Sequence, residues 1–115
     1  GTDGPQEATL TVSVDGDERS ATATGDGPVD AVFNAIHEVV PHTAMLRLFQ
    51  VHAVTEGTDA QAQVSVRLEE DGRIATGQAA DTDTLTASAK AYVNALNNLF
   101  ARKEKTAPEA IASGF

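Results

Sequence analysis

Residues Ala60–Leu68 read AQAQVSVRL and decide the fold class, because they alternate between apolar and polar side chains. Alternation with a period of two is typical of a strand with one buried face. The central Val64-Ser65-Val66 recurs as Val12-Ser13-Val14, and Ala75-Thr76-Gly77 recurs as Ala23-Thr24-Gly25, both at a displacement of 52 positions. We therefore expect two copies of one strand-rich unit.

Further strands and two helices are predicted around these repeats. Alternation and turn residues predict strands over 8–14, 19–24, 46–55, 60–68 and 73–78, with tight turns at Asp15-Gly16, at residues 57–59 and at Glu70-Asp71-Gly72. Apolar residues at helical spacing predict a helix from Pro28 to Val40 and a longer helix from the N-cap candidates at 81–83 to about residue 100. The pattern predicts an α+β fold of two βββα modules, 8–44 and 45–101, whose two helices pack on antiparallel or mixed sheets. Residues 102–115 are expected to form a polar tail.

The start of the chain repeats a stretch from its middle. Gly1-Thr2-Asp3 matches Gly57-Thr58-Asp59, which follows the predicted strand 46–55. The leading strand of the first module is therefore expected to lie upstream of residue 1. The chain also lacks an initiator Met, so we expect it to be a part of a longer product.

Charge and composition disfavour several classes of function. The formal net charge of −9 repels the phosphate backbone of nucleic acids and the surface of anionic membranes. The absence of cysteine excludes disulfides, thiolate nucleophiles and sulfur-ligated zinc. No apolar run approaches the ~18 residues of a membrane span, and no signal peptide is present at the start. A cytoplasmic location is expected.

No catalytic or metal centre is predicted from the residues. His37-Glu38 and His42 are reminiscent of a His-Glu-x-x-His zinc motif, but the second histidine comes five residues after the first, beyond Pro41. Ser20 and Ser88 lack the context of a nucleophile elbow. The residues alone predict a small-ligand-binding or assembly domain, and a free-standing hydrolase would need a catalytic group that the sequence does not offer.

Two turns that precede helices could bind an amino acid. Gly25-Asp26-Gly27-Pro28 leaves backbone N–H groups at a helix start, which suits an anion, or forms a tight turn with nothing bound. In the second turn, Asp81 and Asp83 either cap the helix or bind an ammonium group. Small and apolar residues could line a side-chain pocket, although close packing explains the alanines equally well; they are Leu46, Phe49, Ala53, Ala60 and Ala62.

Four stretches carry a resemblance to one family. They cover most of residues 8–100 in the order of the family, and they are Ala23–Ala31, Val51–Gln61, Asp83–Ser88 and Ala91–Asn97. With them the chain resembles the C-terminal regulatory, dimer-forming domain of 2-isopropylmalate synthase, which acts in leucine biosynthesis. The family is built from a pair of βββα modules, like the repeat described above.

The resemblance implies a function in feedback inhibition. The complete enzyme condenses acetyl-CoA with 3-methyl-2-oxobutanoate in a TIM barrel that uses a divalent metal, so this chain is expected to hold no catalytic residue and no cofactor. L-leucine is expected as the effector, bound between the modules near a homodimer interface. Carried over by position, the effector residues are Gly25, Gly27, Pro28, Val29 and Asp30 in one loop, Leu46, Phe49, Ala53, Ala60 and Ala62 in an apolar wall, and Thr82, Asp83 and Thr84 in a second loop.

Two alternatives stay open. Citramalate synthase carries a similar regulatory domain that responds to isoleucine, and the position of one methyl group is worth only about 1–3 kcal/mol to a hydrophobic pocket. A pure dimerisation module without a working effector pocket is the other alternative.

Overall fold

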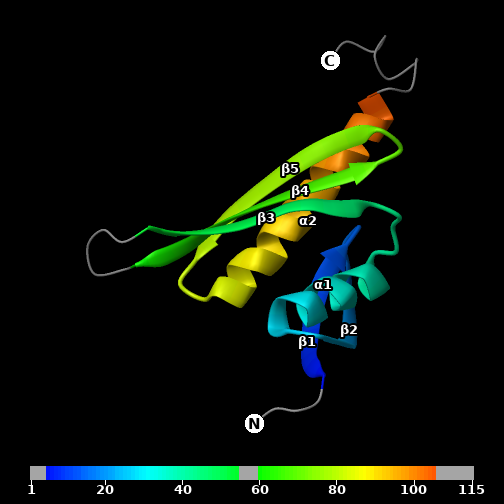
Figure 1. Cartoon of the computed structure of the whole chain (residues 1–115). Coiled ribbons are helices and arrows are strands. Elements are labelled where there is room, and N and C mark those ends of the chain that lie inside the picture. The colour runs from blue at the N-terminus through cyan, green and yellow to red at the C-terminus, as the bar shows by residue number, and fades with distance from the viewer. Residues whose placement is uncertain (1–4, 55–59, 106–115) are drawn as a thin grey trace. The chain divides into compact units, whose positions relative to one another are not determined.

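The computed structural model describes residues 5–54 and 60–105 of the chain. The chain consists of two compact units, residues 1–43 and residues 44–115. In chain order the first unit contains β1 (Gln6–Val14), β2 (Asp17–Gly25) and α1 (Pro28–Val39), and the second contains β3 (Met45–Val54), β4 (Gln61–Glu70), β5 (Arg73–Asp81) and α2 (Thr84–Lys105) (Figure 1). The predicted α+β arrangement of strands followed by a helix, twice, is confirmed. The polar tail was expected from residue 102, but α2 continues to Lys105, so this boundary is wrong. The expected turn at 57–59 and residues 106–115 lie outside the described residues.

Tight turns fix the register of both hairpins. In the first unit Asp15 and Gly16 connect β1 to β2 with φ angles of 53° and 87°. Asp71 and Gly72 connect β4 to β5 with φ angles of 53° and 79°. Positive φ at both central residues is typical of the type I′ turn, whose twist matches that of antiparallel strands and which favours Asp-Gly. The predictions of turns at these two places are confirmed.

The two units repeat at a displacement of 56 positions, and the expected displacement of 52 is wrong. The turns Asp15-Gly16 and Asp71-Gly72 are 56 positions apart. Val14 is the last residue of β1, whereas Val66, its expected equivalent, lies within β4. Short tripeptides of strand-forming residues match easily out of register. The Asp-Gly turn is a better marker, because only a few residue types accept its backbone angles.

The core of the second unit lies between α2 and the strands β4 and β5. Alternate residues of β4 are fully buried, namely Val64, Val66 and Leu68. Small residues of α2 allow the helix to approach the sheet closely, and Ala87, Ala91 and Ala95 have no exposed surface. Gly77 of β5 permits the closest approach, because a Cβ atom at this position would overlap the backbone of Ala91 and Ala95.

The first unit has a smaller core, in which α1 packs on β1 and β2. Its most buried residues are Ala23, Ala31, Val32, Phe33, Ala35, Ile36 and Val39. On the exposed side of the hairpin, Thr9 pairs with Thr22 and Thr11 with Ser20, with 2.7 Å between the hydroxyl oxygens of each pair. Among the described residues, neither helix combines the length and the apolar character that a membrane span needs.

The single tyrosine of the chain reports on the second core. Burial raises the pKa of the Tyr92 phenol to about 12, from its ordinary value of 10.0. Since the folded state favours the neutral phenol, this contribution to stability is present below the ordinary pKa and is lost as pH rises through the folded value. We expect the ultraviolet absorbance of the phenolate to rise near pH 12 in the folded chain and near pH 10 in urea. A folded chain that titrates like the unfolded one would contradict the burial of Tyr92.

Candidate functional site

The start of α1 offers backbone amides without a side-chain cap. The N-cap residue Gly27 is extended and provides no capping hydrogen bond, and Pro28 occupies the first turn. The N–H groups of Val29 and Asp30 belong to the first turn of the helix, whose amides have no acceptor within the helix. These amides and the positive end of the helix dipole favour an anionic group.

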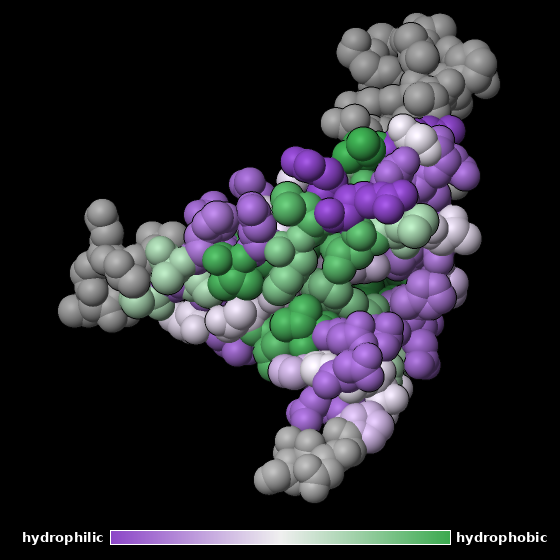
Figure 2. Space-filling model, in the orientation of Figure 1, coloured by the Kyte–Doolittle hydropathy of each residue, from purple (hydrophilic) through white to green (hydrophobic). Residues whose placement is uncertain are grey.

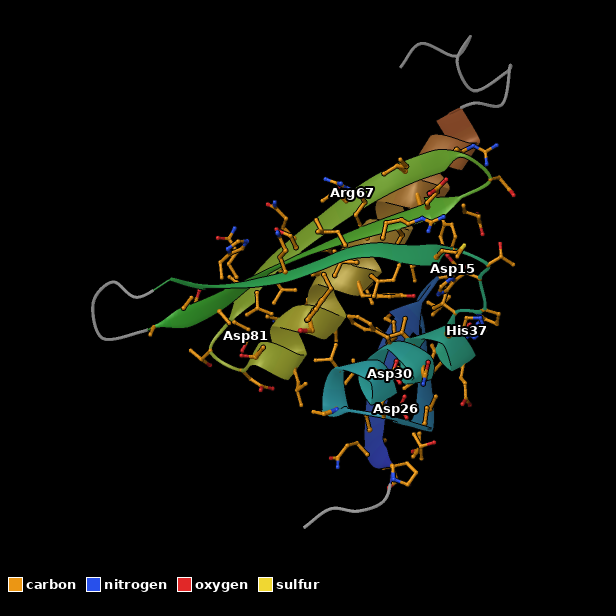
Figure 3. All side chains as sticks on the ribbon, in the orientation of Figure 1. Asp15, Asp26, Asp30, His37, Arg67 and Asp81 are labelled. Carbon is orange, nitrogen blue, oxygen red and sulfur yellow. The ribbon has the colours of Figure 1, made fainter. Side chains whose placement is uncertain are left out.

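Two features hold this helix start in place. The Asp30 carboxylate reaches back and accepts a hydrogen bond from the backbone N–H of Asp26 at 3.0 Å (Figure 3). Gly25 lets the end of β2 lie against the first turn, because a Cβ atom there would come within 2.5 Å of the Ala31 nitrogen and 2.7 Å of the Asp30 carbonyl carbon. Gly27 differs, since a Cβ atom at this position would meet open space. Gly25 is therefore required by packing, and Gly27 is not.

The start of α2 is capped by its own carboxylates. The two carboxylate oxygens of Asp83 accept hydrogen bonds from the backbone N–H groups of Leu85 at 3.4 Å and Thr86 at 3.3 Å, and the Thr86 hydroxyl donates a third at 2.5 Å. The Asp81 carboxylate accepts a hydrogen bond from the backbone N–H of Asp83 at 3.0 Å. It also forms an ion pair with Lys90 Nζ at 3.1 Å. The structure therefore shows that Asp83 caps the start of α2.

Both carboxylates of this turn are held in the ionised form. The hydrogen bond from the Thr86 hydroxyl is the main reason that the pKa of Asp83 is lowered. The backbone N–H of Asp83 and then Lys90 lower the pKa of Asp81. At neutral pH both carboxylates are thus negatively charged, and the charge of Asp81 is paired with that of Lys90.

These pKa shifts predict a loss of stability in acid. Since both values are lowered in the folded chain, the stabilisation is present above the ordinary carboxyl pKa of about 3.9 and is lost as pH falls through the folded values. Replacing Asp81 and Asp83 by Asn is expected to lower the urea midpoint of unfolding at neutral pH. The midpoint of this variant is also expected to fall less as the pH is lowered. Asp26→Asn is the matched control, because its backbone and not its carboxylate makes the bond described above. The prediction would be contradicted if the urea midpoint fell equally steeply with decreasing pH in the Asp81/Asp83 variant and in Asp26→Asn.

The predicted apolar wall lies within the second unit. Leu46, Phe49 and Ala53 are on β3, Ala60 immediately precedes β4, and Ala62 is on β4. Ala53 lies directly opposite Ala62 in the register, and Leu46 and Phe49 lie opposite Leu68 and Val66. Leu46, Ala53 and Ala60 are exposed. The wall residues thus share neighbouring strands, and Thr82, Asp83 and Thr84 follow the end of β5 in the same unit, whereas Gly25–Asp30 belongs to the first unit.

The partners that fix the second turn were not predicted from the sequence. Lys90 lies on α2, nine residues after Asp81 in the sequence. Ion pairs are predicted from sequence only at spacings of three or four residues along one helix, so this pair could not be predicted. Thr86 could have been found, because a hydroxyl three residues after an N-cap aspartate is well placed to bond its carboxylate. Both residues act by restraining a carboxylate.

The two histidines near the end of α1 contact each other. Their ring centroids are 4.9 Å apart, and His37 Nε2 bonds the backbone oxygen of His42 at 2.9 Å. Across residues 5–54 and 60–105, no three side chains of His, Asp or Glu gather as a metal site requires.

Comparison with known proteins adds a family and several relatives. The family model described as "LeuA allosteric (dimerisation) domain" matches residues 1–100. A 2-isopropylmalate synthase of Caulobacter vibrioides (strain NA1000 / CB15N) is 84% identical over 116 residues, which cover all of this chain and 22% of that protein. A 2-isopropylmalate synthase of Afipia carboxidovorans is 61% identical over 113 residues, which cover 98% of this chain and 22% of that protein. The chain thus spans about a fifth of the length of these curated relatives.

Proposed function

Because the chain belongs to the LeuA allosteric (dimerisation) domain family, we propose that it is the leucine-sensing part of a 2-isopropylmalate synthase. In this proposal L-leucine binds to the chain and inhibits the condensation of acetyl-CoA with 3-methyl-2-oxobutanoate. The chemistry takes place in a metal-dependent TIM barrel in the remaining part of the longer protein. The chain itself supplies effector binding and homodimer contacts, and it performs no catalysis.

The difference between the two helix starts is the observation that carries the proposal. The start of α1 has no side-chain cap and offers N–H groups, which suit a carboxylate. Asp83 at the start of α2 remains ionised, which suits an ammonium group, whereas Asp81 is already paired with Lys90. A free amino acid carries both groups. Asp83 can accept the ammonium group through oxygen lone pairs that its long bonds to Leu85 and Thr86 leave available.

The apolar wall is proposed to receive the isobutyl group. Leu46, Ala53 and Ala60 are exposed in the second unit and offer apolar surface to a ligand. Burial of apolar area stabilises such a complex by about 25 cal/mol per Å². Leucine therefore fits this surface better than a polar amino acid does.

Inhibition requires that leucine bind two states of the enzyme with different affinity. A coupling free energy of about 1–3 kcal/mol, typical of allosteric enzymes, gives roughly 5–150-fold control. In the proposal, leucine binding favours one state of the dimer, and the dimer passes this change to the barrel.

Calorimetric titration of the 115-residue chain with leucine, isoleucine and valine tests the proposal. Leucine is expected to bind most tightly, and amide NMR shifts are expected at residues 25–31 and 77–84. Tighter binding of isoleucine would favour the citramalate-synthase type of domain. The absence of heat and of shifts at millimolar ligand, from a chain that still dimerises, would overturn the sensing function in favour of pure assembly.

A further inference from the structure

The outer strand β3 of the second unit has an edge without a strand partner. The order of the sheet is β3-β4-β5, and no other strand of the described residues pairs with β3. Met45–Val54 presents ten residues along this edge. Backbone N–H and C=O groups that point outward from an edge strand form a template for another strand.

The opposite edge of the same sheet is protected by α2. Asn94 donates a side-chain hydrogen bond to the backbone oxygen of Gln78 at 2.9 Å, and Asn98 donates one to that of Thr76 at 2.7 Å. Both acceptors lie on β5. Two carbonyl groups of β5 are therefore already bonded to the chain's own helix, which disfavours the addition of a strand there.

The side chains of β3 suit a contact with another protein. Three of the four exposed large apolar residues in the described part of the chain lie on this strand, and they are Met45, Leu46 and Val51. The core contacts of α2 are to β4 and β5. Figure 2 shows hydrophobic residues, in green, along the course of β3.

Charges that normally protect an edge are missing from most of β3. Arg47 is bonded to Glu69 at 2.7 Å, at an irregularity in the register between Leu46 and Leu48. Residues 48–54 contain no Lys, Arg, Asp, Glu or Pro. Natural proteins place such residues on edge strands that must stay unpaired. Their absence from residues 48–54 favours pairing of this edge with another strand.

We propose that β3 pairs antiparallel with β3 of a second copy of this chain across a two-fold axis. Such an interface is isologous, because both copies contribute the same strand. A second copy is the occupant that fits, since the family to which the chain belongs is one of dimerisation domains. The inference rests on the dimer contacts of the proposed function and adds the surface that makes them. It does not depend on leucine binding.

Single cysteines test the geometry, because the chain has no cysteine of its own. We would introduce Leu48→Cys, Gln50→Cys and His52→Cys separately and measure oxidative cross-linking of the 115-residue chain. The variant nearest the two-fold axis is expected to form a disulfide dimer at least tenfold faster than the control Gln78→Cys. This control lies on β5 in the same cross-strand row as Gln50, through Ser65.

Charge substitution provides an independent measurement. The double variant Leu46→Lys and Val51→Lys is expected to weaken the dimer at least 100-fold in sedimentation equilibrium. Ile74→Lys on β5 is the matched control, because Ile74 is 45% exposed, like Leu46 at 45% and Val51 at 46%. Circular dichroism establishes that each variant is folded.

Three results would overturn the proposal: a monomeric wild-type chain at high concentration, cross-linking at Gln78 as fast as at any β3 position, or a double-lysine variant that dimerises like the wild type. Failure of leucine to bind would leave these measurements unaffected. The failure of the sensing function and the failure of this interface are thus distinguishable.

Discussion

Gly77→Val is expected to lower the free energy of unfolding of the second unit by about 3 kcal/mol or more. Even the first carbon of the new side chain would overlap the backbone of Ala91 and Ala95, and backbone cannot rotate away as a flexible side chain can. The helix must therefore move from β5. Since Asn94 and Asn98 bond β5 from the same helix, their bonds to the strand are expected to break as well.

Urea unfolding followed by circular dichroism measures this effect, with Ala80→Val as the control. Ala80 is an exposed residue of the same strand, so the same side chain there is expected to change stability by less than about 0.5 kcal/mol. The fluorescence or absorbance of Tyr92, which is buried in the same core, reports whether the packing has loosened. A loss below about 1 kcal/mol in Gly77→Val would contradict the close approach of helix and strand.

Gly25→Ala is expected to reduce leucine affinity at least 100-fold. The added methyl group would come within 2.5 Å of the Ala31 nitrogen and 2.8 Å of an Asp30 carboxylate oxygen. The first turn of α1 would have to move away from β2, and the amides of Val29 and Asp30 would move with it. Calorimetric titration measures the affinity, and thermal unfolding measures the accompanying loss of stability, about 1–3 kcal/mol.

Gly27→Ala separates binding from packing at the same helix start. Its Cβ atom meets open space, and the φ angle of −141° is one that alanine adopts, so the stability is expected to fall by less than about 1 kcal/mol. A ligand carboxylate held by the first turn would approach this methyl group, and leucine affinity is therefore expected to drop. Unchanged leucine affinity in both Gly25→Ala and Gly27→Ala would remove this helix start from the effector site.

Local chemistry made the elements of the fold predictable from the sequence. Asp15-Gly16 and Asp71-Gly72 accept the positive φ angles that a two-residue hairpin requires, and Pro28 fits the first turn of a helix. The register of the repeat was wrong because it was taken from tripeptides of strand formers. The match of Gly1-Thr2-Asp3 with Gly57-Thr58-Asp59 has the displacement of 56 that the turns also show.

The candidate site was predictable only in its local part. Sequence identified Asp83 as a candidate cap, since a capping side chain bonds amides two or three residues away. It could not identify Lys90 as the partner of Asp81, nor Asn94 and Asn98 as partners of β5, because these contacts depend on how α2 lies on the sheet. Tertiary packing, which no local pattern encodes, decides them.

The asparagines of α2 have a consequence for how large an assembly can become. A sheet with two open edges can add copies without limit and form fibrils, as cross-β aggregates do. Here Asn94 and Asn98 occupy carbonyl groups of one edge, which leaves β3 as the growing end. Two copies joined through β3 would leave this sheet without an open edge, so strand addition to this sheet would end with a pair of copies.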